Sequence, residues 1–539
     1  MNTDENSYYI NFYSPLFDFL SKTEIFDLIF TIQLRVTTSK ENNLHQYCIS
    51  KFNELNKLNI RYSSLSIYFT IDEIDEYLKE YNINFAQLKK LYINFDTMSR
   101  ENYNLVNTFF PLIRSAYNLV YLSMSLTGYF YENKIGPSTC EFINSFKSLE
   151  YLSLQFFKFN SNFTLNLKTL KTLELYTCIN IGLTKDVCLH LKSLTLESTE
   201  IVNVNNQLYS FPELEFISLE RTNDKNYKSK KLYIDFQSLG KLKTFKGNFN
   251  YFLSLESPLL EEIDLKKDFV FFNDLYSIEE QKRIIGKICL SECLKRIDLI
   301  LDKINNDEKI YENQYENTSV EEMHLEYNKE ECYKMYNFQN LFINLTDLFI
   351  KTEYFKESLD PKFQIIENCK SKVKNLHVNI QSYSNGYEIY CQSFEKLESI
   401  EFSLSILKEI DLKNLFPIFS DCCNVMFKCL KSCKFVLLFT EVSFEILNNI
   451  FNNLDNIPNL IEFSLNCIPK KKDVSFFKKF IRKICSKKFI KKINIKMSKE
   501  NNEIYSKKEL KKIFSDINFD IFYEVNIRKI DSNMSCSIF

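Results

Sequence analysis

The chain has 539 residues, of which 45% are apolar and 26% are charged, and its formal net charge is -2 at pH 7. These values exclude wholesale disorder, and the balanced charge does not favour a nucleic-acid-binding protein. Seven Gly and nine Pro leave no stretch that is typical of a flexible linker, so we expect one continuous body. Residues 1–14 lack the features of an export signal, which predicts a cytoplasmic protein whose Cys residues are mostly reduced.

Residues 17–52 predict two or three amphipathic helices. Their apolar positions are Leu20, Ile25, Leu28, Ile29, Ile32 and Leu34. One interpretation is a helical N-terminal cap, residues 1–54, that covers the exposed edge of the structure that follows. The alternative is an F-box, because the segment from Leu20 to Ile29 resembles the start of that motif, although it lacks the Leu-Pro opening and the later Trp. This resemblance implies a substrate adaptor of a ubiquitin ligase, with a Skp1-like subunit as its partner.

Residues 55–530 repeat one pattern, in which apolar residues occupy the first, fourth and sixth of six positions. Clean copies begin at Leu149, Leu170, Leu191 and Leu214. Looser copies begin at 55, 88, 119, 242, 260, 294, 320, 345, 373, 397, 430, 460, 490 and 522, and those at 242, 430 and 522 fit least well. The last three positions of each copy alternate with period two, which predicts a short strand with one buried face. Parallel stacking of such strands builds one continuous core.

The repeat resembles the leucine-rich-repeat superfamily, in its irregular, ribonuclease-inhibitor-like form. This resemblance implies an α/β solenoid, a leucine-rich-repeat horseshoe with a parallel concave sheet and mixed helical or extended convex returns. Helical spacing predicts helical returns at 276–293 and 444–454, while the short repeats from 149 to 219 have room only for an extended or single-turn return. The family's Asn or Cys after the strand is matched by Cys178, and Thr199 and Thr222 occupy that place in the next two repeats.

The outward strand positions predict a binding surface for a protein partner. In the middle of the chain these positions are mainly acidic, which favours a basic partner, and tyrosines near the N-terminal end supply aromatic anchors such as Tyr92 and Tyr121. The predicted partner-binding residues are Tyr151, Glu174, Tyr176, Glu197, Glu220, Glu262, Asp264, Asp298, Glu322, His324 and Glu326. The alternative is an ordinary solvated strand face whose sign of charge arises by chance.

No cofactor, metal site or catalytic constellation is predicted. His324 and His377 share one outward position two repeats apart, which places their rings about 10 Å from each other, too far to share one metal ion. Cys422, Cys423, Cys429 and Cys433 do not have zinc-ligand spacing, and buried thiols are the favoured interpretation. We therefore expect a non-enzymatic protein.

The C-terminal part combines a basic stretch with a prenylation motif. Residues 470–499 hold thirteen Lys or Arg against the single acid Asp473. The residues proposed to contact anionic lipid are Lys478, Lys479, Arg482, Lys483, Lys487, Lys488, Lys491 and Lys492. In the tail, residues 531–539, Cys536 stands where a prenyl acceptor is expected, and one prenyl chain needs such a basic patch as a second signal. The alternatives for the basic stretch are an ordinary solvated helix, contact with anionic lipid that helps to tether the chain to the cytoplasmic face of a membrane, and contact with nucleic acid, which the balanced charge does not favour.

Overall fold

The computed structural model describes part of the chain, which divides into two compact units. Unit 1 comprises Met1–Leu260 with Lys267–Val270, and unit 2 comprises Glu261–Lys266 with Phe271–Phe539. The described residues are 8–10, 30–36, 62–70, 89–96, 116–127, 137–199, 201–202, 208–220, 233–265, 278–300, 316–327, 342–352, 372–382, 396–406, 429–442, 462–469, 492–496 and 522–524.

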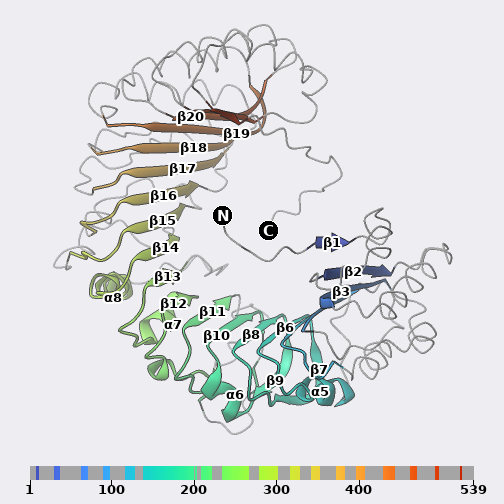
Figure 1. Cartoon of the computed structure of the whole chain (residues 1–539). Helices are drawn as coiled ribbons and strands as arrows, with labels where there is room; N and C mark the ends of the chain where they lie inside the picture. The colour runs from blue at the N-terminus through green and yellow to red at the C-terminus, as the bar shows by residue number, and fades with distance from the viewer. Residues whose placement is uncertain are drawn as a thin grey trace. The chain divides into compact units, whose positions relative to one another are not determined.

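The described strands of unit 1 form a parallel sheet in which each repeat contributes one strand (Figure 1). In order of pairing they are β1 (Tyr8–Ile10), β2 (Phe30–Val36), β3 (Tyr62–Thr70), β4 (Lys90–Asp96), β5 (Tyr121–Thr127), β6 (Tyr151–Gln155), β8 (Thr172–Tyr176), β10 (Ser193–Glu197), β11 (Phe216–Glu220) and β12 (Thr244–Lys246). The pairing order follows the chain order, as expected for a solenoid.

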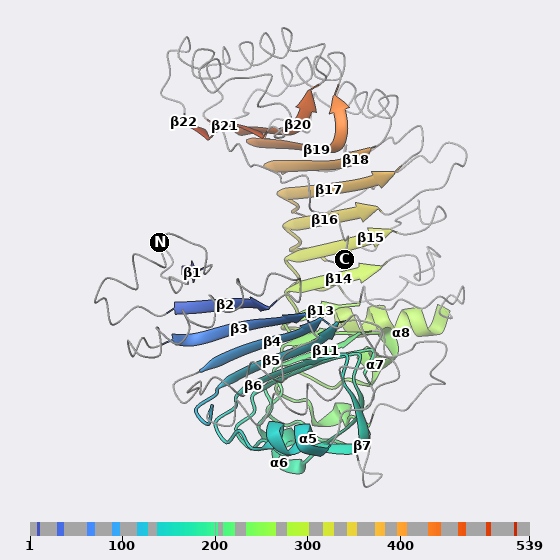
Figure 2. The same ribbon diagram turned by 90° about the vertical axis from the view of Figure 1, so that its right-hand side faces the viewer.

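Unit 2 contains a second series of parallel strands, which succeed one another in chain order (Figure 2). They are β13 (Glu262–Asp264), β14 (Arg296–Ile300), β15 (Glu322–Tyr327), β16 (Asp347–Thr352), β17 (Asn375–Ser382), β18 (Ser399–Ile406), β19 (Ser432–Val442), β20 (Glu462–Pro469), β21 (Lys492–Lys496) and β22 (Phe522–Glu524). Each unit is thus an α/β solenoid.

The apolar positions of the repeat form rows of buried side chains across each sheet. In unit 1, Leu173 pairs with Leu152 and Leu194, and all three are completely buried. In unit 2, Ile297 pairs with Met323 in the same way. Strand register confirms all of the predicted copies except those at 55 and 522, and it confirms the poorly fitting copies at 242 and 430.

The copy predicted at 55 lies outside the described residues, and the strand that pairs with β4 is β3, on which Leu65 is in register with Leu91. The copy predicted at 522 is misplaced. On β22 the residue in register with Ile493 is Tyr523, not the expected Val525. A six-residue pattern with permissive apolar positions matches by chance in such apolar stretches, and only strand pairing selects the true register.

The predicted helices around Ile32 and Leu34 are wrong at these two residues, which lie on strand β2. The physical reason is the strict alternation of apolar and polar residues from Phe30 to Val36, which has the period of a strand and not of a helix. Residues 11–29 and 37–61, including the start of the F-box-like segment at Leu20, lie outside the described residues.

The described returns are short helices or extended segments, as the repeat lengths predicted. Within the short repeats, β7 (Lys158–Leu165) pairs with β9 (Ile179–Leu183) in a second small parallel sheet. The described helical segments are α5 (Pro137–Asn144), α6 (Lys185–His190), η2 (Phe236–Ser238), α7 (Phe249–Ser254) and α8 (Ile278–Cys289). Helix α8 confirms the helical return predicted at 276–293, and its Ile284, Ile285 and Ile288 are buried. The return predicted at 444–454 lies outside the described residues.

None of the helices in the described ranges has the length and apolar character needed to cross a bilayer.

Strands in the short repeats end in a tight turn that hydroxyl and thiol groups stabilise. Thr199 Oγ1 donates to the carbonyl oxygen of Leu175 at 2.9 Å and accepts the N–H of Cys178 at 3.1 Å. The Cys178 thiol lies 3.3 Å from the carbonyl oxygen of Leu154. Cys and Thr therefore do here what Asn is expected to do, because both can donate a hydrogen bond to the preceding repeat. Thr222 lies outside the described residues.

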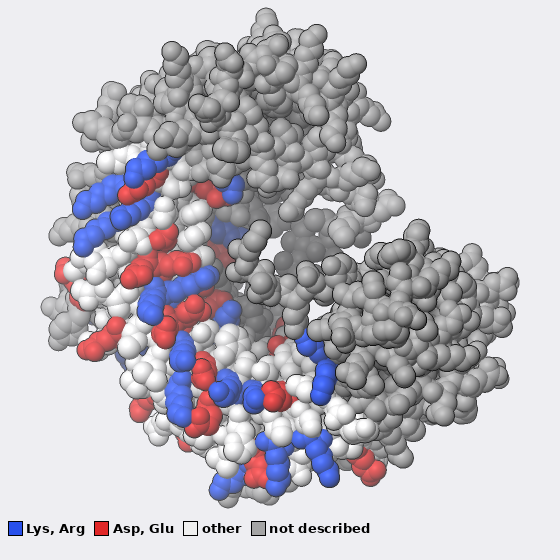
Figure 3. Space-filling model, in the orientation of Figure 1, with Lys and Arg blue, Asp and Glu red and all other residues white. Residues whose placement is uncertain are grey.

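Basic and acidic side chains are interspersed on the described surface (Figure 3). Several of them stand just before the strands and pair between neighbouring repeats. Lys171 lies 2.8 Å from Glu150, and Lys243 lies 2.9 Å from Glu215. In unit 2 the corresponding pair of Lys431 with Glu398 has a separation of 2.6 Å. Exposed pairs of this kind each contribute less than about 1 kcal/mol, so they mainly balance the charge along the edge where the strands begin.

Candidate functional site

The strand residues between the buried positions present one exposed face on each sheet. On β8 the burial alternates, with Leu173 and Leu175 buried and Thr172, Glu174 and Tyr176 partly exposed. Side chains at one strand position stand beside their register partners, about 4.8 Å from the next strand. On the exposed face, outward side chains at equivalent positions of neighbouring repeats therefore lie next to one another.

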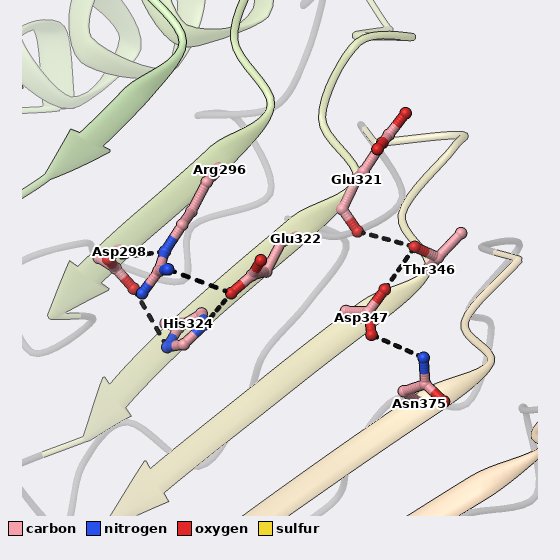
Figure 4. Close-up of polar contacts among 8 residues, drawn as sticks. All are labelled: Arg296, Asp298, Glu321, Glu322, His324, Thr346, Asp347 and Asn375. Atoms are coloured by element: carbon pink, nitrogen blue, oxygen red, sulfur yellow. Dashed lines mark hydrogen bonds and ion pairs between the residues drawn. The ribbon is translucent and has the colours of Figure 1, made fainter. Parts of the chain in front are cut away.

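In unit 2, side chains from β14 and β15 form a polar cluster on this face (Figure 4). Arg296 Nε lies 3.3 Å from Asp298 Oδ2, and Arg296 Nη1 lies 3.5 Å from Glu322 Oε1. His324 lies between the two carboxylates, with Nδ1 3.3 Å from Asp298 Oδ1 and Nε2 2.6 Å from Glu322 Oε1. Asp298 is buried, and Arg296 supplies the positive charge that a buried carboxylate needs.

A second group of polar side chains fixes Asp347 on the neighbouring strand β16 (Figure 4). Thr346 Oγ1 donates to Asp347 Oδ2 at 2.6 Å, and Asn375 Nδ2 donates to Asp347 Oδ1 at 2.6 Å. Both carboxylate oxygens are thus held in place by hydrogen bonds from two repeats. Side chains fixed in this way lose little conformational entropy when a ligand binds.

Next to the cluster, three flat rings stack across three strands. Phe349 on β16 lies in register between His324 and His377. Its ring centroid is 4.0 Å from that of His324 and 4.2 Å from that of His377, and both pairs are stacked. The prediction that the two histidines share one outward position two repeats apart is confirmed, and the sequence reasoning missed the phenylalanine between them.

A carboxylate and a lysine continue the row beyond His377. Glu401 Oε2 lies 3.3 Å from His377 Nδ1, and Glu401 Oε1 accepts from Lys434 Nζ at 2.6 Å. The hydrogen bond from His377 and that from Lys434 hold the pKa of Glu401 at about 2, although its partial burial opposes this shift. Glu401 is therefore charged at neutral pH.

In unit 1, tyrosines form a comparable row across β4, β5 and β6. Tyr92 and Tyr121 are tilted against each other with ring centroids 4.7 Å apart, and Tyr121 and Tyr151 are stacked at 4.0 Å with nearly parallel planes. Tyr151 Oη donates to Glu174 Oε2 at 2.6 Å, and Tyr176 Oη donates to the same oxygen at 3.3 Å. The predicted residues Tyr151, Glu174 and Tyr176 therefore lie together.

The hydroxyls of Tyr121 and Tyr151 remain protonated at physiological pH. Burial, opposed in part by the hydrogen bond with Tyr151, raises the pKa of Tyr121 to about 12. Burial and the hydrogen bond to the Glu174 carboxylate raise the pKa of Tyr151 as well. The phenols of Tyr151 and Tyr176 both donate hydrogen bonds to the Glu174 carboxylate.

The other predicted partner-binding residues take the strand positions that the repeat implied. Glu197 pairs in register with Tyr176 and with Glu220, which is described here by its backbone alone. Glu262 and Asp264 pair with Arg296 and Asp298. Glu326 lies 3.3 Å from Lys351 Nζ.

The predicted list contained acids, two tyrosines and one histidine but omitted cations on the same face. Arg296, Lys351 and Lys434 each stand at an outward strand position and contact a carboxylate. The charge of the unit 2 face is consequently more balanced than the acids alone predicted. These residues, together with Phe349 and Glu401, could have been found from the sequence by aligning all repeats and listing every residue at each outward strand position.

The predicted lipid-contacting residues, the prenylation site and the cysteine cluster lie wholly or partly outside the described residues. Lys492 lies at the start of β21, and the other basic residues proposed to contact lipid, as well as Cys536, lie outside the described residues. Cys433 is buried in the row that contains Ile400, and burial raises the pKa of its thiol, whereas Cys429 is exposed. Cys422 and Cys423 lie outside the described residues. Within the ranges that the structure describes, no group of three or more His, Cys, Asp or Glu side chains has the arrangement of a metal site.

Sequence comparisons with known proteins give no match, and a comparison with solved structures gives a match of low similarity. No protein-family model matches the chain, and no curated protein matches it. A solved structure titled "Crystal structure of TLR13-ssRNA13 complex" matches with a TM-score of 0.29 and 11% sequence identity, covering 79% of this chain and 68% of that chain. At this TM-score the match supports no conclusion about the fold or the function of this chain. The α/β solenoid of leucine-rich-repeat type rests on the chain's own repeated strands and buried rows.

Proposed function

We propose that the chain is a non-enzymatic scaffold that binds a protein partner on the exposed strand faces of its solenoid units. The observation that carries this proposal is the pair of aromatic rows on these faces, the tyrosine row of unit 1 and the stack around Phe349 in unit 2. Partly exposed aromatic side chains held rigidly in place are frequent anchors of protein interfaces.

The polar surroundings of both rows support the same function. Each row is bordered by carboxylates that receive hydrogen bonds or ion pairs, such as Glu174 in unit 1 and Glu401 in unit 2. Aromatic anchors surrounded by fixed polar groups combine affinity with specificity, because a partner must match both the rings and the charges. The presence of these carboxylates favours a protein over nucleic acid, whose phosphates they would repel.

The proposal is tested by photo-crosslinking from defined positions. A benzoylphenylalanine replaces Tyr121 or Phe349 on the strand faces, and in matched variants it replaces Lys185 on α6 or Arg283 on α8, which belong to returns. After irradiation in an extract of the source cells, crosslinked proteins are identified by mass spectrometry. We expect one set of partners from the strand positions that is absent from the return positions. Identical products from both kinds of position would contradict the proposal.

A further inference from the structure

The tyrosine row of unit 1 ends abruptly at Tyr151. The next strand, β8, places Thr172 in register with Tyr151, and β10 places Ser193 in register with Thr172. Beyond them Phe216 on β11 is the next aromatic residue at this position. Two small side chains thus separate two large ones along the exposed face.

One ring face of Tyr151 is covered and the other is directed to these small residues. Tyr121 stacks on Tyr151 from the β5 side, and this is the ring contact of Tyr151 within the described part of the chain. The opposite face is directed to β8, where Thr172 stands in register with Tyr151 and no aromatic ring of the described residues stacks on it. Beyond the small residues Thr172 and Ser193, the chain itself places a cation over an aromatic ring. Lys246 Nζ lies 5.6 Å from the centroid of the Phe216 ring.

Glu174 supplies negative charge at the edge of the uncovered ring face. Its Oε2 accepts hydrogen bonds from Tyr151 and Tyr176, and within the described residues its carboxylate has no cationic partner. This distinguishes it from Glu322, Glu326 and Glu401 in unit 2, each of which contacts a cation. The Tyr151 hydroxyl stays neutral, because burial and the carboxylate itself raise its pKa, so it donates a hydrogen bond to Glu174 but brings no positive charge.

From this geometry we infer that Tyr151 and Glu174, above Thr172 and Ser193, form a binding site for an arginine side chain of a basic segment of the protein partner. A guanidinium group is planar, so it continues the stack on the uncovered face of Tyr151 at the spacing of the next strand. In that position its N–H groups donate to the Glu174 carboxylate. A lysine ammonium meets the charge and can lie over a ring, as Lys246 does over Phe216, but it has no planar group to continue the stack, so the site prefers arginine.

This inference rests on the proposed function and adds the chemistry of the partner to it. The test uses the full chain and two fluorescein-labelled probes, a peptide of alternating Arg and Ser and its Lys counterpart, with binding measured by fluorescence anisotropy. Glu174→Gln removes the charge, and Thr172→Tyr extends the aromatic row and fills the site. The matched controls are Glu150→Gln, the same change at an exposed ion pair of unit 1, and Thr244→Tyr, the same change at the equivalent position of β12.

The wild-type chain is expected to bind the Arg peptide more tightly than the Lys peptide. Glu174→Gln and Thr172→Tyr should each weaken Arg-peptide binding by about tenfold, the effect of losing one charge-assisted hydrogen bond or the stacking place, while the controls stay within about twofold. Equal binding of both peptides, or equal effects of test and control variants, would overturn the inference. Because Thr172→Tyr introduces a residue with high strand propensity at an exposed position, its fold is expected to persist, and its melting temperature checks this.

The two proposals fail in distinguishable ways. If crosslinks remain confined to the strand faces while Glu174→Gln leaves Arg-peptide binding unchanged, the arginine site is wrong and the scaffold function stands. If crosslinks arise equally from faces and returns, the scaffold function is wrong whatever the peptide data show.

Discussion

Asn317 is predicted to be one of the most important single polar residues for the stability of unit 2. It is 3% exposed, and its amide nitrogen lies 3.3, 3.2 and 3.1 Å from the carbonyl oxygens of Ile288, Cys289 and Ser291 at the end of α8. Its amide oxygen accepts the backbone N–H groups of Ser319 and Val320, both at 2.9 Å. One side chain therefore joins the end of a helix to the turn before the next strand.

Asn317→Ala removes all of these bonds and leaves two backbone donors and the helix-terminal acceptors without partners. A buried group left unsatisfied costs about 1–3 kcal/mol. Water reaches the partly buried Ser319 and reduces the total, so we expect a local loss of about 3 kcal/mol. The matched control is Asn344→Ala, because Asn344 donates at 2.7 Å to the carbonyl oxygen of Thr318 in an exposed setting, where the loss should be under about 1 kcal/mol.

The assay is native-state hydrogen exchange followed by mass spectrometry. A loss of about 3 kcal/mol raises the exchange rate of amides that open locally by about 150-fold. This acceleration should appear in peptides that cover the end of α8 and the start of β15, and it should be much smaller in Asn344→Ala. Equal exchange in the two variants would refute the reasoning that Asn317 links the two elements.

Two further predictions concern backbone strain and pH. Ser198 follows β10 with a φ of 48°, in the left-handed region that disfavours L side chains, so Ser198→Gly should stabilise unit 1 by about 0.5–1 kcal/mol, whereas Ser123→Gly inside β5 should destabilise it by a similar amount in thermal unfolding. A destabilised Ser198→Gly variant would contradict this account. The contacts of Glu401 with His377 and Lys434 lower its pKa to about 2, so its stabilisation is present above about pH 4.5 and disappears as the pH falls towards 2. The stability difference between wild type and Glu401→Gln, at most about 3 kcal/mol, should therefore narrow over that range in pH-dependent melting, and a constant difference would exclude this role.

Period-two alternation predicted the strands because the buried rows need apolar residues at fixed positions in every repeat. The rows of buried side chains through Leu173 and Ile297 are examples. Cys433, in a copy that fits the pattern poorly, also lies in such a row, in register with Ile400. The same signal was available from Phe30 to Val36, where reading the residues as a helix overlooked a regular alternation. Composition of a single segment does not reveal register, which depends on pairing with the neighbouring strand.

The candidate sites were predictable only in part, because neighbours on the sheet are far apart in sequence. Aligning the repeats placed His324 and His377 correctly, and the same alignment contained Phe349 between them. The stacking of Tyr121 on Tyr151 and the pairing of Arg296 with two carboxylates depend on side-chain conformations, which the repeat pattern does not specify. The bonds of Asn317 lie in an irregular segment to which no periodicity applies.

The central claim is that a protein partner binds to the exposed strand faces. The most direct measurement is covalent footprinting of side chains in the full chain, with and without a partner identified by crosslinking. The account predicts protection of side chains on the strand faces, such as Tyr151 in unit 1 and His324 in unit 2, with no change on return helices such as α8. Protection confined to the returns, with the strand faces equally reactive in the free and bound states, would contradict it.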